Sequence, residues 1–162
     1  MNYTLHKATQ ADTAFLWDML LESLYVQEGQ KPFDRSILQE PFMAKYVEGW
    51  GRSGDVGYIA RNENGIAVGS ITARLYTEAN KGFGYVGDDV PELGMAILAE
   101  HRGKGLGKLL METLIAELRI NGVGKLSLSV DPSNEAAVIL YTRYGFKEIG
   151  VVGTSIAMVT EL

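Results

Sequence analysis

A short basic, glycine-rich segment is the part of this sequence best suited to binding an anion. Its residues are Arg102, Gly103, Lys104, Gly105, Leu106, Gly107 and Lys108. The segment lies between an apolar run, residues 93–98, and a helical pattern that starts at Leu106. A helix N-terminus presents free N–H groups and partial positive charge, and glycines let the backbone approach an anion closely. No acidic residue occurs in residues 101–111, although the whole chain has a net charge of −5, so a pyrophosphate is the simplest ligand.

An ordinary strand-to-helix loop is the alternative interpretation of these glycines. Two well-known phosphate-binding loops do not match the segment. The P-loop requires Gly-Lys followed by Ser or Thr, whereas Leu109 follows Lys108. The dinucleotide-binding fingerprint requires a third glycine at the position that Lys108 occupies.

The segment instead resembles the GNAT superfamily of acetyl-CoA-dependent N-acetyltransferases. The family signature is Arg/Gln-x-x-Gly-x-Gly/Ala after a strand, and Arg102, Gly105 and Gly107 match it in full. The resemblance is specific over residues 92–146 and weak before Tyr58.

A second motif adds to this resemblance. The family has an Asn followed seven residues later by a Tyr, and these correspond to Asn134 and Tyr141. The family ending YxxxGF corresponds to Tyr141, Gly145 and Phe146. The two motifs together imply a GNAT-type fold. This is an α/β fold with a mixed, mostly antiparallel central sheet, helices on both faces, and central strands that diverge to admit the cofactor.

The resemblance implies that acetyl-CoA is the co-substrate. No metal is expected, because the chain has no cysteine and only two histidines. The turn at residues 103–108 would bind the pyrophosphate, with Arg102 and the two lysines adding charge; a solvated basic surface is the alternative. The pantetheine arm would bind the main-chain edge of Met95, Ala96 and Ile97, whose side chains are expected in the core. Asn134 would bind the pantetheine or the adjoining loop, or would only cap its helix.

Tyr141 is the candidate general acid, because the resemblance implies that this Tyr protonates the departing thiolate. On its apolar helix face a Tyr would otherwise be a core residue. Many family members have a catalytic Glu where this chain has Ser129, which cannot act as a base. Glu92 is the other position that the family uses, and a surface carboxylate at a strand end is its alternative interpretation.

Residues around the acceptor are less defined. Three acidic residues in a glycine-rich loop could attract a cationic amine or could be solvated: Glu78, Asp88 and Asp89. Trp17 and Trp50 could line an acceptor pocket or belong to the core.

Hydrophobic periodicity predicts alternating strands and helices. The predicted helices are residues 12–24, 36–47, 106–120 and 134–144, with Pro41 inside the second. The predicted strands are residues 3–6, 56–61, 66–76, 93–98, 125–130, 146–152 and 155–161. The run at 93–98 is nearly all apolar, which predicts a central strand buried on both faces. We expect one acetyltransferase domain, residues 1–162.

Composition excludes several classes of protein. With 46% hydrophobic residues the chain is expected to fold, and its acidity argues against a nucleic-acid binder. It has no cysteine and only two histidines, which argues against disulfides, thiol nucleophiles and catalytic triads. No apolar run is long enough to cross a membrane, so a cytoplasmic location is expected.

The sequence therefore predicts an N-acetyltransferase that transfers the acetyl group directly to an amine in a ternary complex. The acceptor is a small molecule or a peptide, and a homodimer is possible. Two alternatives stay open. One is a non-catalytic module that binds acyl-CoA as a sensor, and the other is an acyl transfer other than N-acetylation.

Overall fold

The computed structural model describes residues 2–162, which form one seven-stranded sheet with the order β1-β2-β3-β4-β5-β7-β6. The strands are β1 (Thr4–Lys7), β2 (Val56–Arg61), β3 (Ala67–Arg74), β4 (Glu92–Ile97), β5 (Lys125–Val130), β6 (Lys147–Val152) and β7 (Ser155–Glu161). Every neighbouring pair is antiparallel except β4 with β5, which are parallel. The expected mixed, mostly antiparallel sheet is confirmed.

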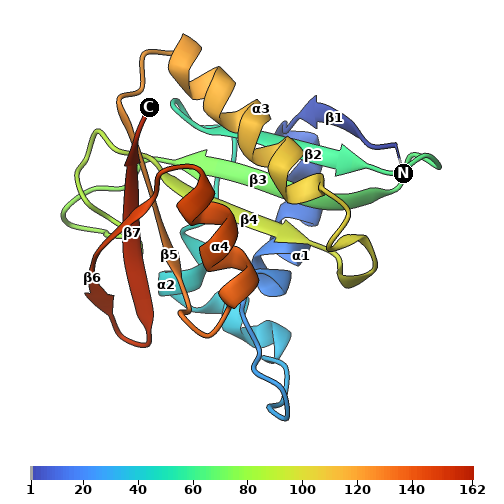
Figure 1. The fold of residues 1–162 in the computed structure, drawn as a ribbon, viewed down its shortest axis with the longest axis horizontal. Helices are drawn as coiled ribbons and strands as arrows, with labels where there is room; N and C mark the ends of the chain where they lie inside the picture. The colour runs from blue at the N-terminus through green and yellow to red at the C-terminus, as the bar shows by residue number, and fades with distance from the viewer. Residues whose placement is uncertain (1) are drawn as a thin grey trace.

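Helices cover both faces of this sheet. The α-helices are α1 (Thr13–Glu22), α2 (Pro41–Ala44), α3 (Leu106–Ile120) and α4 (Glu135–Arg143). Short 3-10 helices are η1 (Gln10–Asp12), η2 (Arg35–Gln39) and η3 (Ala99–His101). In Figure 1, α3 and α4 lie in front of the sheet and α1 lies behind it. Within residues 2–162, no helix combines the length and apolar character needed to cross a membrane.

The two faces of the sheet bury separate hydrophobic clusters. The α3 face contains fully buried Leu110 and Leu114 together with Ala60 of β2. The opposite face contains Leu16 of α1 with Ile59 of β2. Adjacent residues of β2 point to opposite faces because side chains alternate along a strand. Burial of both faces fixes the register of the strands that carry the site.

The helix expected at residues 36–47 is wrong. Two short elements, η2 and α2, replace it. Glu40, the residue between them, has ψ 133° and is therefore extended. The pyrrolidine ring of Pro41 disfavours a helical conformation in the preceding residue, and Pro41 itself begins α2 because its missing N–H is harmless there.

A truncation in α3 tests this packing. Leu110 is 0% exposed and its neighbour Leu109 is 36% exposed. We expect Leu110→Ala to lower the free energy of unfolding by about 2–5 kcal/mol, because the deletion leaves a cavity. Leu109→Ala is the matched control and should cost much less. Urea denaturation measures both, and equal losses would contradict the assignment of the α3 core face.

Candidate active site

The central feature of the site is the divergence of β4 from β5. The two strands share one register pair, Glu92 opposite Ser127. In contrast, β3 pairs with all of β4, from Arg74 opposite Glu92 to Gly69 opposite Ile97. Beyond Glu92, β4 therefore has no β5 partner in the described part of the chain, and Figure 1 shows the two strands running in different directions. An open strand edge can bind the amides of a peptide-like ligand. The expected divergence of the central strands is confirmed.

The divergence also corrects an expectation about burial. The central strand was expected to be buried on both faces, but Met95 and Ile97 are only partly buried. Ala96 is buried at 8% exposure. Because β5 turns away, it cannot cover the second half of β4.

The glycine-rich turn lies between η3 and α3. Gly103 and Gly105 have φ values of 72° and 84°, in the left-handed region that favours glycine. A Cβ on either residue would meet no atom within 4 Å, so the turn faces open space. The first helical bond of α3 runs from the N–H of Leu109 to the carbonyl oxygen of Gly105 at 3.2 Å. The N–H groups of residues 106–108 precede this bond and are not used by the helix ladder, as expected for an anion site.

The third glycine has a packing role. A Cβ on Gly107 would lie 3.1 Å from Leu140 of α4, 3.7 Å from Ile97 and 3.8 Å from Met95. Gly107 therefore lets the start of α3 approach both α4 and the open end of β4. The three elements that carry the predicted cofactor residues meet at this point.

Arg102 connects the turn to its surroundings. Its Nε donates to the carbonyl oxygen of Ile97 at 2.9 Å, and its guanidinium forms an ion pair with Glu22 of α1 at 3.0 Å. The side chain therefore holds the last residue of β4 and the end of α1 against the turn. Binding of a phosphate by Arg102 stays a prediction. Lys104 lies in the turn before Gly105, and Lys108 lies in the first turn of α3 after Gly107.

Tyr141 lies in α4 and is buried, at 7% exposure, with its ring 5.8 Å from that of Phe146. Burial raises the pKa of its phenol to about 12, so the hydroxyl stays protonated at neutral pH. Asn134 is the N-cap of the same helix, and its Oδ1 accepts a hydrogen bond from the N–H of Ala137 at 3.4 Å. The capping role is thus present, and contact of Asn134 with a cofactor stays a prediction.

Glu92 is not a surface carboxylate, and that interpretation is wrong. Its exposure is 4%. Tyr46 donates its phenolic hydrogen to Oε2 at 2.7 Å, and the N–H of Gly84 donates to Oε1 at 3.0 Å. Burial raises the pKa of Glu92 to about 7, against the lowering effect of both donors and of the Lys45 charge. A carboxyl with a pKa near neutrality can take up and release protons at physiological pH.

Residues 82–84, here called the covering segment, lie directly over this carboxylate. A Cβ on Gly82 would come within 2.2 Å of Glu92 Oε1, and one on Gly84 within 2.5 Å of the main chain of Leu128. Only glycines let the segment fit between Glu92 and β5. Sequence reasoning missed this segment and Tyr46. The Gly-Phe-Gly pattern of residues 82–84 was the only sequence feature that could have indicated the covering segment. No local sequence feature indicated Tyr46.

The remaining candidate residues for the acceptor side lie in different environments and do not form one pocket. Trp50 is buried at 3% exposure and belongs to the core. Trp17 is partly buried and lines a surface hollow between α1 and η2. The acidic residues of the loop before β4 are exposed: Glu78, Asp88 and Asp89. Ser129 on β5 is partly buried, and its hydroxyl cannot replace the carboxylate of a general base.

Comparison with known proteins agrees with this geometry. The model of the acetyltransferase (GNAT) family matches residues 14–146. The chain belongs to the GNAT family. A crystal structure of a phosphinothricin acetyltransferase from Sinorhizobium meliloti in complex with AcCoA has a TM-score of 0.71 at 20% identity, covering 100% of this chain and 89% of the other. The PaiA N-acetyltransferase from Thermoplasma acidophilum, in complex with coenzyme A, has a TM-score of 0.73 at 18% identity and full coverage of both chains. These structures share the GNAT fold.

Curated GNAT relatives match shorter stretches. The ribosomal protein bS18-alanine N-acetyltransferase of Escherichia coli (strain K12) is 41% identical over 61 residues, which are 38% of this chain and 41% of that protein. The mycothiol acetyltransferase of Thermobispora bispora is 34% identical over 90 residues, which are 56% of this chain and 30% of that protein. The chain therefore spans less than half the length of these relatives.

The raised pKa of Glu92 predicts a pH-dependent stability. The folded protein favours the protonated carboxyl up to about pH 7, whereas the unfolded chain loses the proton near 4.5. Stability from this group is therefore present at low pH and is lost as pH rises from about 4.5 to 7. We expect a loss of up to about 3 kcal/mol over this range. Glu92→Gln should remove this component.

Urea denaturation of wild type and Glu92→Gln at several pH values between 4.5 and 8 measures the difference. Glu117→Gln is the control, because hydrogen bonds lower the pKa of that carboxyl. Parallel stability curves for wild type and Glu92→Gln would show that Glu92 titrates normally.

Proposed function

We propose that this GNAT chain, acting as one domain over residues 1–162, is an acetyl-CoA-dependent N-acetyltransferase. The observation that carries the proposal is the open edge of β4 beside a glycine turn at the N-terminus of α3. The strand edge suits the pantetheine arm of the cofactor, and the glycine turn suits its pyrophosphate. Family membership and the relatives that acetylate amines support the same activity.

The cofactor would lie along β4 and end at the turn. The N–H groups around residues 103–108 would bind the pyrophosphate, with Lys104 and Lys108 contributing charge. The main chain of residues 95–97 would bind the pantetheine amides, and Arg102 would hold this strand end through the carbonyl of Ile97. Asn134 would add a contact from the start of α4. Acetyl-CoA would supply the thioester carbonyl that the acceptor attacks.

We assign the base to Glu92 and the acid to Tyr141. An amine has a pKa of about 10 and is mostly protonated at pH 7, so it must lose a proton before it attacks. Glu92 takes this proton and releases it to solvent. A C–N bond then forms, the C–S bond breaks, and Tyr141 gives its proton to the sulfur. The nitrogen then loses its second proton, which returns to the Tyr141 phenolate and restores the acid. Because the amine attacks the thioester directly, no covalent acyl-enzyme forms.

The acceptor would be an amine of a small molecule or a peptide. The exposed acidic residues before β4 favour a cation at this end of the site. A cytoplasmic location is part of the same proposal.

Cofactor binding depends on the left-handed glycine of the turn. We expect Gly105→Val to abolish CoA binding, because a β-branched residue strains at a φ of 84° and its side chain fills the space in front of the turn. Gly122→Val is the matched control. Gly122 ends the same helix with a φ of 77° and open space around its Cβ, so the backbone strain is similar. Calorimetric titration with CoA measures both folded variants, and unchanged affinity in Gly105→Val would refute this site.

Turnover depends on the Tyr141 proton. We expect Tyr141→Phe to reduce the rate of thiol release from acetyl-CoA by about 10²–10⁴-fold when chemistry is rate-limiting, with near-normal CoA affinity. A panel of amines and peptides first supplies an acceptor. Because the Tyr141 hydroxyl has no hydrogen-bond partner within residues 2–162, the melting temperature should change little and serves as the control for folding. A wild-type rate in Tyr141→Phe would make Tyr141 a core residue only, and CoA binding without thiol release for any acceptor would support the acyl-CoA sensor.

A further inference from the structure

Tyr46 joins Glu92 to the covering segment. Its hydroxyl donates to Glu92 Oε2 at 2.7 Å and accepts a hydrogen bond from the N–H of Phe83 at 2.7 Å. The N–H of Gly84 donates to the other carboxylate oxygen. The phenol is thus the middle of a directed chain that runs from the main chain of the covering segment to the carboxylate.

We infer that Tyr46 is a positioning residue, which holds the Glu92 carboxylate and the covering segment in one fixed arrangement. The inference rests on the proposed function, because it concerns the group assigned there as the base. Tyr46 acts through Glu92 and is not itself assigned a contact with the substrates.

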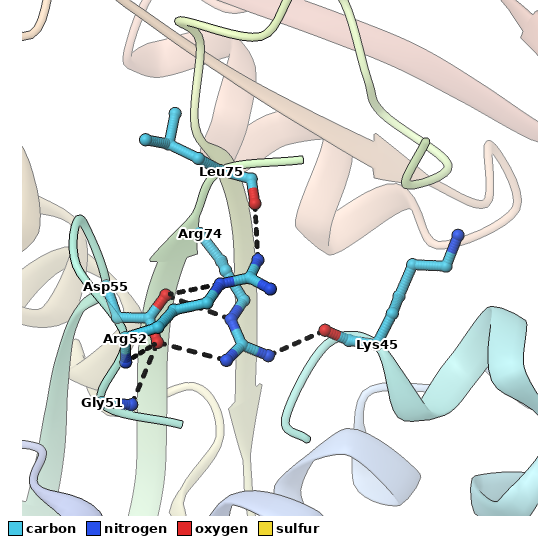
Figure 2. Close-up of polar contacts among 6 residues, drawn as sticks. All are labelled: Lys45, Gly51, Arg52, Asp55, Arg74 and Leu75. Carbon is cyan, nitrogen blue, oxygen red and sulfur yellow. Dashed lines mark hydrogen bonds and ion pairs between the residues drawn. The ribbon is translucent and has the colours of Figure 1, made fainter. Parts of the chain in front are cut away.

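A buried ion pair fixes the backbone next to Tyr46. Arg74 and Asp55 have side chains 1% and 2% exposed, and Arg74 Nε lies 3.1 Å from Asp55 Oδ1. The same guanidinium donates to the carbonyl oxygen of Lys45 at 2.8 Å. Figure 2 shows Arg74 between Asp55 on one side and the Lys45 carbonyl on the other. The residue directly before Tyr46 is therefore tied to β3, the strand that pairs with Glu92.

Aromatic rings fix the orientation of the phenol. Phe83 stacks on Tyr46 with an interplanar angle of 4° and a centroid distance of 6.4 Å. Tyr76 lies against the same ring at 5.3 Å and is tilted by 60°. Because its backbone and both neighbouring rings are in place, Tyr46 can direct its hydroxyl at Glu92 with little further loss of side-chain entropy.

The charged and titratable groups around Glu92 lie on the elements that pack against it, near the end of α2 and on or after β3. Lys45, at the end of α2, stabilises the carboxylate, and its Nζ also donates to the carbonyl oxygen of Lys81 at 2.5 Å. Tyr76 follows β3; burial and the charge of Glu92 raise the pKa of its phenol, which therefore stays neutral and places no charge beside the carboxylate. Arg74 stands opposite Glu92 in the register but is paired with Asp55. The hydrogen bonds from the Tyr46 hydroxyl and the Gly84 N–H are therefore the contacts that most directly oppose the effect of burial on the pKa of Glu92.

Tyr46→Phe tests the inference, since it keeps the ring and removes the donor. Loss of a hydrogen bond to a charged group should raise the titration midpoint of Glu92 by about one pH unit or more. The acidic limb of the pH–rate profile should move to higher pH by the same amount, because the base is then protonated over a wider range. A role in packing alone would move neither quantity.

Tyr76→Phe is the matched control. It removes a phenolic oxygen from a ring in contact with Tyr46, but Tyr76 Oη is buried without a hydrogen-bond partner within residues 2–162. We expect its Glu92 midpoint and its pH–rate profile to equal those of wild type. NMR titration of protein with ¹³C-labelled glutamate side chains measures the midpoint without substrate, and Glu92→Gln identifies the signal.

The outcomes separate this inference from the proposed function. A Glu92 midpoint in Tyr46→Phe equal to that in Tyr76→Phe would overturn the positioning role. A raised midpoint with an unmoved pH–rate profile would support the positioning role and overturn the assignment of Glu92 as base. If Tyr46→Phe does not fold, incorporation of 3-fluorotyrosine at position 46 keeps the ring and strengthens the donor. The midpoint should then fall, and an unchanged value would overturn the inference.

Discussion

The parallel contact between β4 and β5 is limited to Glu92 and Ser127, and the geometry of the site follows from this limit. Had the strands stayed paired, the main chain of residues 93–97 would be used within the sheet and no ligand edge would exist. Because they diverge, the edge is open beside the turn at the start of α3. The same divergence leaves a gap that the covering segment enters at Leu128. The cofactor end and the acceptor end of the site thus have one structural origin.

The position of Glu92 at the point of divergence explains its chemistry. Arg74 stands directly opposite on β3, and a direct ion pair between them would hold the pKa of Glu92 low. Asp55 pairs with Arg74 instead. Glu92 is left with two neutral hydrogen-bond donors and the more distant charge of Lys45, so burial dominates and its pKa is raised to about 7. The Arg74–Asp55 pair therefore has two effects: it engages the guanidinium of the residue opposite Glu92 in the register, and it anchors the backbone beside Tyr46.

Glycines make this arrangement possible in three different ways. Gly105 supplies a left-handed backbone, Gly107 allows α3 to approach α4, and Gly82 leaves room for a carboxylate oxygen. The first is a conformational requirement and the other two are steric. A Cβ would strain the backbone at Gly105, crowd Leu140 at Gly107 and clash with Glu92 at Gly82, yet the three positions look alike in the sequence.

The sequence alone determined the elements whose signals are local. The bounds of α3, β2 and β5 agree with the predicted residues 106–120, 56–61 and 125–130, because periodicity and the flanking glycines act within a few residues. The glycine turn was also predictable, since strand, turn and helix start are adjacent in the chain. The break at Pro41 had a local signal as well, but the predicted helix was extended through it.

The surroundings of Glu92 were decided only by the tertiary structure. Its identity and its place at the start of a strand were visible, but Tyr46 lies 46 positions away and Gly84 belongs to another loop. Burial and hydrogen bonding set a pKa, and both depend on which distant segments pack together. The pairing of Arg74 with Asp55 is likewise a choice between two carboxylates that the sequence presents equally. The chain's local patterns thus define where a cofactor can bind, while long-range packing defines which carboxylate is left to act as a base.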